Sequence, residues 1–260
     1  ERNKPKTPSK FYKYVSTQFE QHLIKKADAI ITVGDCIANY LKDKYKVALP
    51  TVIINAPSEN KINIGGKNLR DELHISANLK LAIYCGGITF NRGLEKLIES
   101  LTLMPNVYLV MMGYGKPVYL AQLKSIAEKH NVVNRFSFYS PVAPNEVTAF
   151  TASADVGIAP IENVCLSYYF CAPNKIFEYL IGGIPVVASN FPELKKVVEE
   201  NEIGYTFDPK DIASIANSVN KVFSDDKNYN KMKENTKFAA KKYNWENESE
   251  KLLNLYKNLV

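Results

Sequence analysis

Between residues 79 and 207 the chain alternates short apolar runs with amphipathic stretches. The apolar runs predict buried strands, and the intervening stretches space their apolar residues as helices do. The predicted strands are 79–87, 106–115, 135–140, 154–160, 185–189 and 204–207, and the predicted helices are 91–104, 119–130, 143–153, 173–183 and 192–200. This alternation predicts an α/β fold with a doubly wound parallel sheet covered by helices on both faces.

The two flanks of this region have other patterns. Before it, helix-like spacing at 11–27 and 36–45 alternates with short apolar runs at 28–34 and 51–57. Residues 58–69 are polar and contain glycines, which predicts a linker. After residue 207 the pattern is helical only. We therefore expect a partial second domain ahead of the sheet and a helical tail behind it.

Composition narrows the class of protein. The 260 residues are 46% hydrophobic, enough for one large domain or two ordinary ones. The net charge is +6, and apart from the first ten residues the basic side chains are scattered. A mildly basic surface suits anionic ligands or lipid headgroups, so we expect no nucleic-acid partner. No apolar run approaches the ~20 residues that span a bilayer.

The ends and the cysteines suggest a cytoplasmic fragment. The chain starts with Glu, and the segment "ERNKPKTPSK" lacks the apolar stretch of a signal peptide, so we expect part of a longer protein. The cysteines form no CxxC pair and the histidines are far apart; they are Cys36, Cys85, Cys165, Cys171, His22, His74 and His130. We expect no metal and no disulfide framework, with the cysteines acting as small buried hydrophobes in a reducing cytosol.

Candidate chemistry follows the strands. Ligands of an open parallel sheet bind beyond the carboxyl ends of the strands. Gly86 and Gly87 end the first strand, and Arg92 at the start of the next helix could pair bidentately with phosphate oxygens. Gly113 and Gly115 end the second strand and let backbone approach a ligand closely. These glycines do not form a GxGxxG dinucleotide motif.

Two further places lie at the same predicted edge. Residues 139–142 follow the third strand, where Tyr139 and Val142 could present backbone groups to a base. The stretch "PNKIFEYLIGG" places Lys175 and Glu178 near the start of an otherwise apolar helix. A simpler interpretation is a Lys175–Glu178 surface pair worth a few tenths of a kcal/mol. The convergence of four such places on one edge favours a binding site.

The ordered series "YCGGITFNRGLEKLIES", "VYLVMMGYG", "FYSPVAPNEV", "ADVGIAP", "PNKIFEYLIGGIPVVAS" and "WENESEKLLNLYKNL" resembles the C-terminal, donor-binding half of family 4 glycosyltransferases of the GT-B fold. Upstream, "KKADAIITVGDCIANYLKDKY" and "PTVIINAP" look like the end of the N-terminal domain of that family. The resemblance implies three parts. These are a remnant of the acceptor-side domain at 1–57, a nucleotide-sugar-binding domain at 58–242, and a closing helix at 243–260 that returns to the N-terminal domain. We expect the apolar face of that helix to pack near residues 11–45.

The resemblance implies retaining transfer of a sugar from a nucleotide-diphosphate sugar to a glycan or lipid-linked acceptor, in surface polysaccharide biosynthesis. It implies no cofactor, since the nucleotide sugar is the donor substrate, and it leaves the catalytic residues unknown, with the missing N-terminal domain as their expected place. The predicted diphosphate-binding residues are Gly86, Gly87, Arg92 and Lys175, and the predicted nucleoside-binding residues are Gly113, Tyr139, Val142 and Glu178. An ionised Glu178 would accept hydrogen bonds from the ribose hydroxyls.

Two positions depart from the pattern of that family. Phe170 replaces the first of two glutamates, and Ile88 stands where a basic residue often follows the strand glycines. Lys175 is the candidate for the missing positive charge.

The same fold also hosts epimerases and phosphorylases. From another class, the chain could be a nucleotide-sugar-binding or partner-docking subunit, inactive alone, whose missing N-terminal domain comes from a second chain. We expect it in the cytoplasm, with a peripheral position at the inner membrane face also open.

Overall fold

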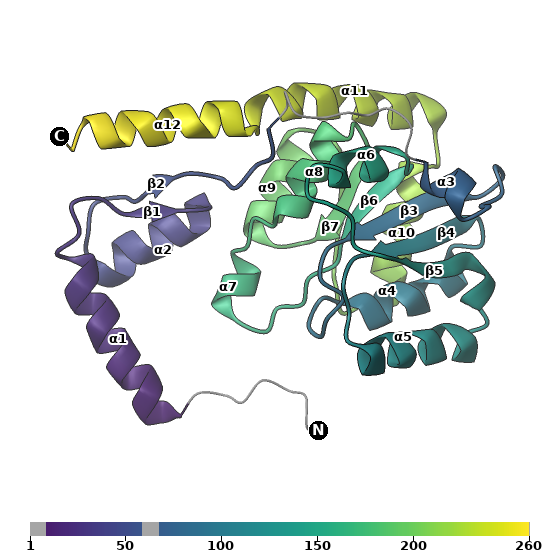
Figure 1. Cartoon of the computed structure of the whole chain (residues 1–260), viewed down its shortest axis with the longest axis horizontal. Coiled ribbons are helices and arrows are strands. Elements are labelled where there is room, and N and C mark those ends of the chain that lie inside the picture. Colours follow the sequence, from purple (N-terminus) through teal and green to yellow (C-terminus); the bar gives the residue numbers. More distant parts are fainter. Residues whose placement is uncertain (1–8, 59–67, 260) are drawn as a thin grey trace.

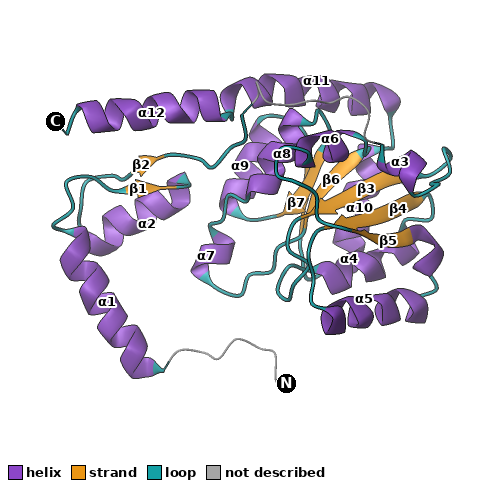
Figure 2. Cartoon of the chain, in the orientation of Figure 1, coloured by secondary structure: helices purple, strands orange, loops and turns teal. Residues whose placement is uncertain are grey.

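The structure is a computed structural model, and it describes residues 9–58 and 68–259. A six-stranded sheet has the order β5-β4-β3-β6-β7-β8 (Figures 1 and 2). Its strands are β3 (Lys80–Cys85), β4 (Val107–Met112), β5 (Phe136–Tyr139), β6 (Val156–Ala159), β7 (Val186–Ser189) and β8 (Gly204–Phe207). Every neighbouring pair is parallel, which confirms the predicted parallel sheet. Most of the predicted linker lies outside the described residues.

Helices cover both faces of this sheet and enclose two apolar clusters. One face carries α4 (Leu94–Ser100), α5 (Pro117–Lys129) and α10 (Ile212–Val222); the other carries α6 (Val147–Ala152), α8 (Asn174–Ile181), α9 (Pro192–Glu200) and α11 (Asp226–Lys242). The doubly wound fold is therefore confirmed. Two four-residue helices, α3 (Leu69–Glu72) and α7 (Leu166–Tyr169), were not predicted, because one turn is too short to show a helical period.

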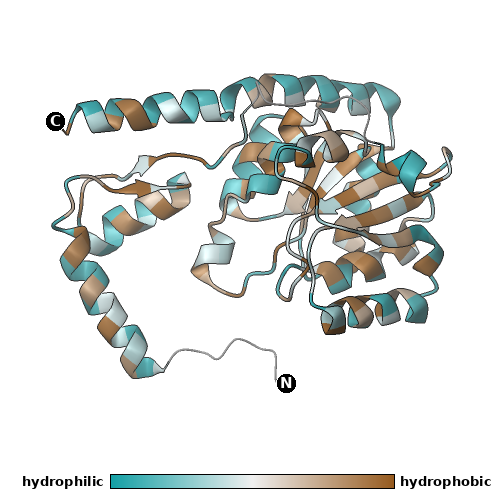
Figure 3. Cartoon of the chain, in the orientation of Figure 1, coloured by the Kyte–Doolittle hydropathy of each residue, from teal (hydrophilic) through white to brown (hydrophobic). Residues whose placement is uncertain are grey.

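A smaller unit precedes the sheet and lies to one side of it (Figure 1). It comprises α1 (Lys10–Ile24), β1 (Ile31–Thr32), α2 (Asp35–Tyr45) and β2 (Thr51–Val52), with β1 parallel to β2. The predicted elements are present, although each strand is shorter than predicted because only two residues of each are paired. Helix α1 has no buried residue, and Figure 3 shows apolar positions along its length.

Two sets of contacts join the smaller unit to the rest of the protein, one through α9 (Pro192–Glu200) and one through the final helix. Glu193 at the start of α9 accepts a hydrogen bond from the Cys36 backbone N–H at the start of α2, and Lys196 pairs with Asp35. The final helix, α12 (Trp245–Lys257), bonds to the segment that leaves β2: Glu248 accepts from the Ile54 N–H at 2.8 Å. In the described ranges no helix combines the length and apolar character needed to cross a membrane.

The tail differs from our expectation in one respect. We expected the apolar face of α12 to pack near residues 11–45, but its hydrogen bonds to the smaller unit reach residues 54–58. Leu253 and Tyr256 remain exposed, each at 59%. The helix is anchored mainly by the buried carboxylate of Glu248 rather than by an apolar face.

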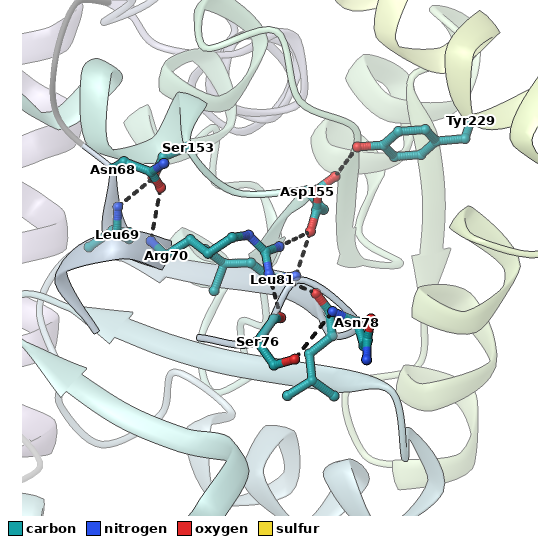
Figure 4. A network of polar contacts seen from close by, with 10 residues as sticks. Asn68, Leu69, Arg70, Ser76, Asn78, Leu81, Ser153, Asp155 and Tyr229 are labelled. Atoms are coloured by element: carbon teal, nitrogen blue, oxygen red, sulfur yellow. Dashed lines mark hydrogen bonds and ion pairs between the residues drawn. The ribbon is translucent and has the colours of Figure 1, made fainter. Parts of the chain in front are cut away.

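A polar network closes the amino edge of the sheet, away from the candidate site (Figure 4). Asp155, just before β6, accepts from the Leu81 N–H at 2.6 Å and from the Arg70 guanidinium at 2.9 Å. The Tyr229 hydroxyl of α11 donates to the Asp155 carbonyl at 3.1 Å. These contacts are internal to the protein, so this edge serves stability.

Candidate functional site

The carboxyl edge of the sheet has its topological switch point between β3 and β6. From β3 the chain adds β4 and β5 on one side, and it then returns to the other side of β3 to add β6, β7 and β8. Ligands of doubly wound sheets bind at such a point, where loops and helix starts leave in opposite directions. The sequence predicted this edge, and the structure places Gly86 and α8 beside the switch point.

Glycine turns lie close together at the ends of β3 and β4. Gly86 has φ +129°, and a Cβ on Gly113 would lie 2.0 Å from the Gly86 carbonyl oxygen, so a side chain at Gly113 would collide. A Cβ on Gly87, by contrast, would meet nothing within 4 Å. The backbone conformation thus favours glycine at Gly86, and close packing requires it at Gly113, whereas Gly87 borders open space that a ligand can occupy.

Lys175 reaches this turn from the first turn of α8. The helix begins at Asn174, one residue after the predicted start, with Pro173 as its N-cap, and the Lys175 side chain is only 9% exposed. The Lys175 Nζ lies 3.5 Å from where a Gly86 Cβ would be and 4.9 Å from the centre of the Tyr84 ring. Burial, and then the nearby positive charge of Arg92, lower the pKa of Lys175 to about 8.

The surface-pair interpretation of Lys175 and Glu178 is wrong. Lys175 is buried, and within residues 9–58 and 68–259 no hydrogen bond or ion pair holds its ammonium group. Glu178 is half-buried on the same helix, and burial raises the pKa of its carboxyl while the charge of Lys175 opposes that rise. One cation and one carboxylate thus lie at the carboxyl edge without neutralising each other.

Arg92 lies two residues before α4, as predicted, and its guanidinium carbon is 4.8 Å from the centre of the Tyr168 ring. Tyr168 comes from α7, which links β6 to α8. The positive charge of Arg92 contributes to the lowered pKa of Lys175, so the two cationic side chains lie within electrostatic range of each other. Neither Tyr84 nor Tyr168 was predicted. An aromatic residue two positions before a strand-ending glycine is the only sequence feature that could have drawn attention to Tyr84.

The predicted base-binding segment borders a cavity of about 500 Å³ formed by residues 138–150. Val142 is half-buried there. The Tyr139 side chain is turned to other partners, since its hydroxyl donates to Glu72 and its ring packs 5.3 Å from Phe150. The Tyr139 carbonyl accepts from the Gly113 N–H at 3.0 Å. Tyr139 therefore fixes the conformation of this segment through its own contacts, and the backbone of Val142 is the better candidate to contact a base.

The two positions that depart from the family pattern, Ile88 and Phe170, both pack against neighbouring residues. Ile88 is 2% exposed and bridges to Gly115, so its side chain belongs to the core. Phe170 packs against Tyr169 at 5.3 Å and against Tyr40 of α2 at 6.1 Å, measured between ring centres. All four cysteines are free thiols. Cys85 is buried as expected, Cys36 and Cys171 are only half-buried, and the expectation was wrong for Cys165, which is exposed.

Comparison with known proteins bears on this geometry. The model of the family "Glycosyl transferases group 1" matches residues 66–238, a stretch that holds all the candidate site residues. The chain belongs to this family. One relative is D-inositol 3-phosphate glycosyltransferase of Corynebacterium urealyticum, which is 26% identical to this chain over 258 residues. The alignment covers 92% of this chain and 59% of the length of the relative.

Solved glycosyltransferase structures share the fold. Sucrose-phosphate synthase from Thermosynechococcus elongatus matches with a TM-score of 0.78 and 19% identity, over 97% of this chain and 64% of its own. The Anabaena protein HepE in complex with UDP-glucose matches with a TM-score of 0.76 and 19% identity, over 89% of this chain and 64% of its own. This group 1 chain thus spans about six tenths of the length of these proteins.

Proposed function

We propose that the chain is the donor-binding part of a retaining family 4 glycosyltransferase that uses a nucleotide-diphosphate sugar. One observation carries this proposal: Lys175 is a buried cation that no ion pair neutralises in the described parts of the chain, and it lies beside Gly86, whose neighbour Gly87 borders open space. A buried charge without a counterion is costly. A diphosphate between Lys175 and Arg92 would supply that counterion.

The nucleoside would lie beside the diphosphate. Glu178 lies one turn after Lys175 on α8 and would accept hydrogen bonds from the ribose hydroxyls. The base would occupy the cavity at residues 138–150, with Gly113 and Tyr139 shaping it and the Val142 backbone facing the base. The UDP-glucose complex of the HepE neighbour supports uracil as the first base to test, in the form of uridine and UDP.

The acceptor side would come from elsewhere. The face of α1 that carries Tyr12, Phe19 and Leu23 is at least 60% exposed, although isolated helices of this length are marginal in water. These features support an acceptor-side domain that covers α1, either in a longer protein or on a second chain. The acceptor would be a glycan or lipid-linked glycan of surface polysaccharide synthesis, reached from the cytoplasm or the inner membrane face.

Without such a partner the chain would act as a nucleotide-sugar-binding or docking subunit. Epimerase or phosphorylase chemistry at the same site stays an alternative, because the fold serves several reactions. No feature of residues 9–58 and 68–259 favours either chemistry over sugar transfer.

Calorimetric titration of uridine and UDP tests the site. Glu178→Gln keeps the size of the side chain and removes its charge, and a charge-assisted hydrogen bond contributes about 1.5 to 3 kcal/mol. We expect this variant to bind uridine at least about tenfold more weakly. Arg92→Ala should weaken the binding of UDP more than the binding of uridine. The loss of UDP affinity should be larger at low salt than at high salt, because salt screens the attraction between Arg92 and the diphosphate.

Two exposed positions offer controls. Lys124→Ala on α5 makes the same change in net charge as Arg92→Ala, and Glu200→Gln repeats the glutamate change at the end of α9. Both should bind like wild type. Uridine affinity within twofold of wild type in Glu178→Gln would show that the ribose assignment is wrong.

A further inference from the structure

Backbone pairing between the central strands β3 and β6 ends before the candidate site at their carboxyl ends. Strand β3 pairs with β4 as far as Cys85, opposite Met112. On its other side, β3 pairs with β6 only at Ala82–Val156 and Ile83–Gly157. Backbone groups of β3 and β6 beyond these pairs need other partners, because buried amides and carbonyls are rarely left without hydrogen bonds.

The hydroxyl of Tyr179 lies between β3 and β6 where their pairing ends. It accepts a hydrogen bond from the Cys85 N–H at 2.9 Å, and it lies 3.3 Å from the Ile83 carbonyl and 3.2 Å from the Ile158 carbonyl. A phenol has one hydrogen to donate, so the two carbonyls share it, which accounts for the longer distances. One side chain thus joins β3 and β6 where direct pairing has ended.

Gly157 makes room for this arrangement. A Cβ on Gly157 would lie 2.3 Å from two ring carbons of Tyr179, closer than any packed carbon pair. Tyr179 itself is fully buried, at 0% exposure. Glycine within a strand often marks close approach of another group, and here that group is the Tyr179 ring.

The hydroxyl connects the two halves of the candidate site. On one side it holds Cys85, the residue before the Gly86–Gly87 turn. On the other side it belongs to α8, one residue after Glu178 and one turn after Lys175. We propose that Tyr179 is a positioning residue, whose hydroxyl sets the separation between the Gly86–Gly87 turn and the charged groups of α8. This inference rests on the proposed function, since it assigns a separation that matters for a bound nucleotide.

The test combines nucleotide binding with amide hydrogen exchange on the intact chain. Tyr179→Phe keeps the ring and removes the hydroxyl, so the Cys85 N–H loses its acceptor. We expect UDP affinity to fall at least tenfold and exchange at the Cys85 amide to accelerate. Tyr229→Phe is the matched control, because it removes a tyrosine hydroxyl bond at the opposite edge of the same sheet. It should lower thermal stability while leaving UDP affinity within twofold.

A second variant guards against misfolding of the first. Gly157→Ala keeps the hydroxyl but displaces the ring, and it should weaken UDP binding in the same way. UDP affinity within twofold of wild type in folded Tyr179→Phe would overturn the positioning role. If wild type itself does not bind UDP, the proposed function fails instead. The link between Tyr179 and Cys85 is then judged by exchange alone, and unchanged exchange at Cys85 would refute it.

Discussion

The two regions of the chain bury their apolar residues to very different extents. In the six-stranded region, Leu97 of α4 and Leu81 of β3 are 0% exposed, and helices close both faces of the sheet. In the smaller unit, Phe11 is 77% exposed and Leu23 is 60% exposed, and α1 contributes no residue to a core. The first region buries its own apolar residues, whereas in the second α2 buries Ala38 and Tyr45 and α1 leaves its apolar residues uncovered.

This difference separates two kinds of argument. In the proposed function, every residue assigned to nucleotide binding lies in the six-stranded region, so nucleotide binding can be tested on this chain. In the proposed function, transfer to an acceptor would depend on a partner that covers the face of α1 that the smaller unit leaves exposed. A large exposed apolar patch usually marks an interaction surface. The contrast predicts that substitutions in the two regions have unequal effects, which the following experiments measure.

The largest expected difference comes from one substitution made in both regions. Leu97→Ala removes a fully buried side chain from a helix and should cost about 2 to 5 kcal/mol of unfolding free energy. Leu23→Ala makes the same change in α1 and should cost less than about 0.5 kcal/mol. Denaturant unfolding of both variants measures this contrast. Equal losses would mean that α1 is packed in solution, against this account.

The contact between α12 and the smaller unit is the next in size. Glu248 is 0% exposed, and its carboxylate accepts from the Ile54 N–H and from Lys251. Glu248→Ala leaves that buried N–H without an acceptor, which should cost about 1 to 3 kcal/mol. Glu250→Ala, an exposed position on the same helix, is the control and should be nearly neutral. Unchanged hydrogen exchange at Ile54 in Glu248→Ala would contradict the contact.

The contact between α9 and α2 should have a smaller effect. No side chain within α2 caps its start, and the Glu193 carboxylate of α9 serves there instead. Glu193→Ala should therefore cost about 1 kcal/mol and speed exchange of the α2 amides. The three atoms nearest to a Cβ on Gly34 all belong to Glu193, so truncation of Glu193 removes the closest contacts that a serine at Gly34 would meet.

The double variant separates capping from docking. When Gly34→Ser is added to Glu193→Ala, the new hydroxyl gives the helix a local cap, and exchange within α2 should slow again. The tie to α9 stays broken, so solution scattering should still report a less compact chain than wild type. Restored compactness would show that Glu193 only caps the helix.

The pH dependence of nucleotide binding is the smallest of these effects. The pKa of Lys175 is lowered to about 8 in the folded chain, so its positive charge is present below pH 8 and is lost above it. A diphosphate binds the charged form, so affinity should fall about fourfold between pH 7 and pH 8.5. Lys175→Met should remove that dependence and so controls for ionisation of the nucleotide. A flat profile for wild type would contradict the role of Lys175.

Folding stability should change in the opposite direction over a higher range. The pKa of Lys175 lies below its usual value of 10.5, so the unfolded chain binds the additional proton. The contribution of Lys175 to stability therefore becomes more favourable as pH rises from about 8 towards 10.5. Lys175→Met should lack that contribution in thermal unfolding scans.

The sequence predicted the sheet because its strands are buried on both faces and read as uninterrupted apolar runs. It predicted β1 and β2 as longer strands, since apolar pattern alone does not reveal that only two residues of each find a partner. Lys175 and Glu178 could be identified from their position in an apolar helix. The burial of Lys175 could not, because it depends on Tyr84 and Gly86 of a strand about 90 residues earlier.

Long-range contacts also explain what was missed around the site. The function of Tyr179 depends on the parting of β3 from β6, and local sequence carries no trace of that parting. Helix α7 has a single turn and no apolar period, yet it brings Tyr168 over Arg92. Side chains that follow a strand were predictable as candidates, whereas the groups that hold them in place required the structure.

A crystal structure of the chain with UDP tests the central claim most directly. The account predicts the diphosphate beside Gly86 and Gly87, with Lys175 and Arg92 as its positive partners and the ribose hydroxyls on Glu178. UDP bound elsewhere, for example against the smaller unit, or a nucleotide at the switch point with no contact to Lys175 and Glu178, would contradict it.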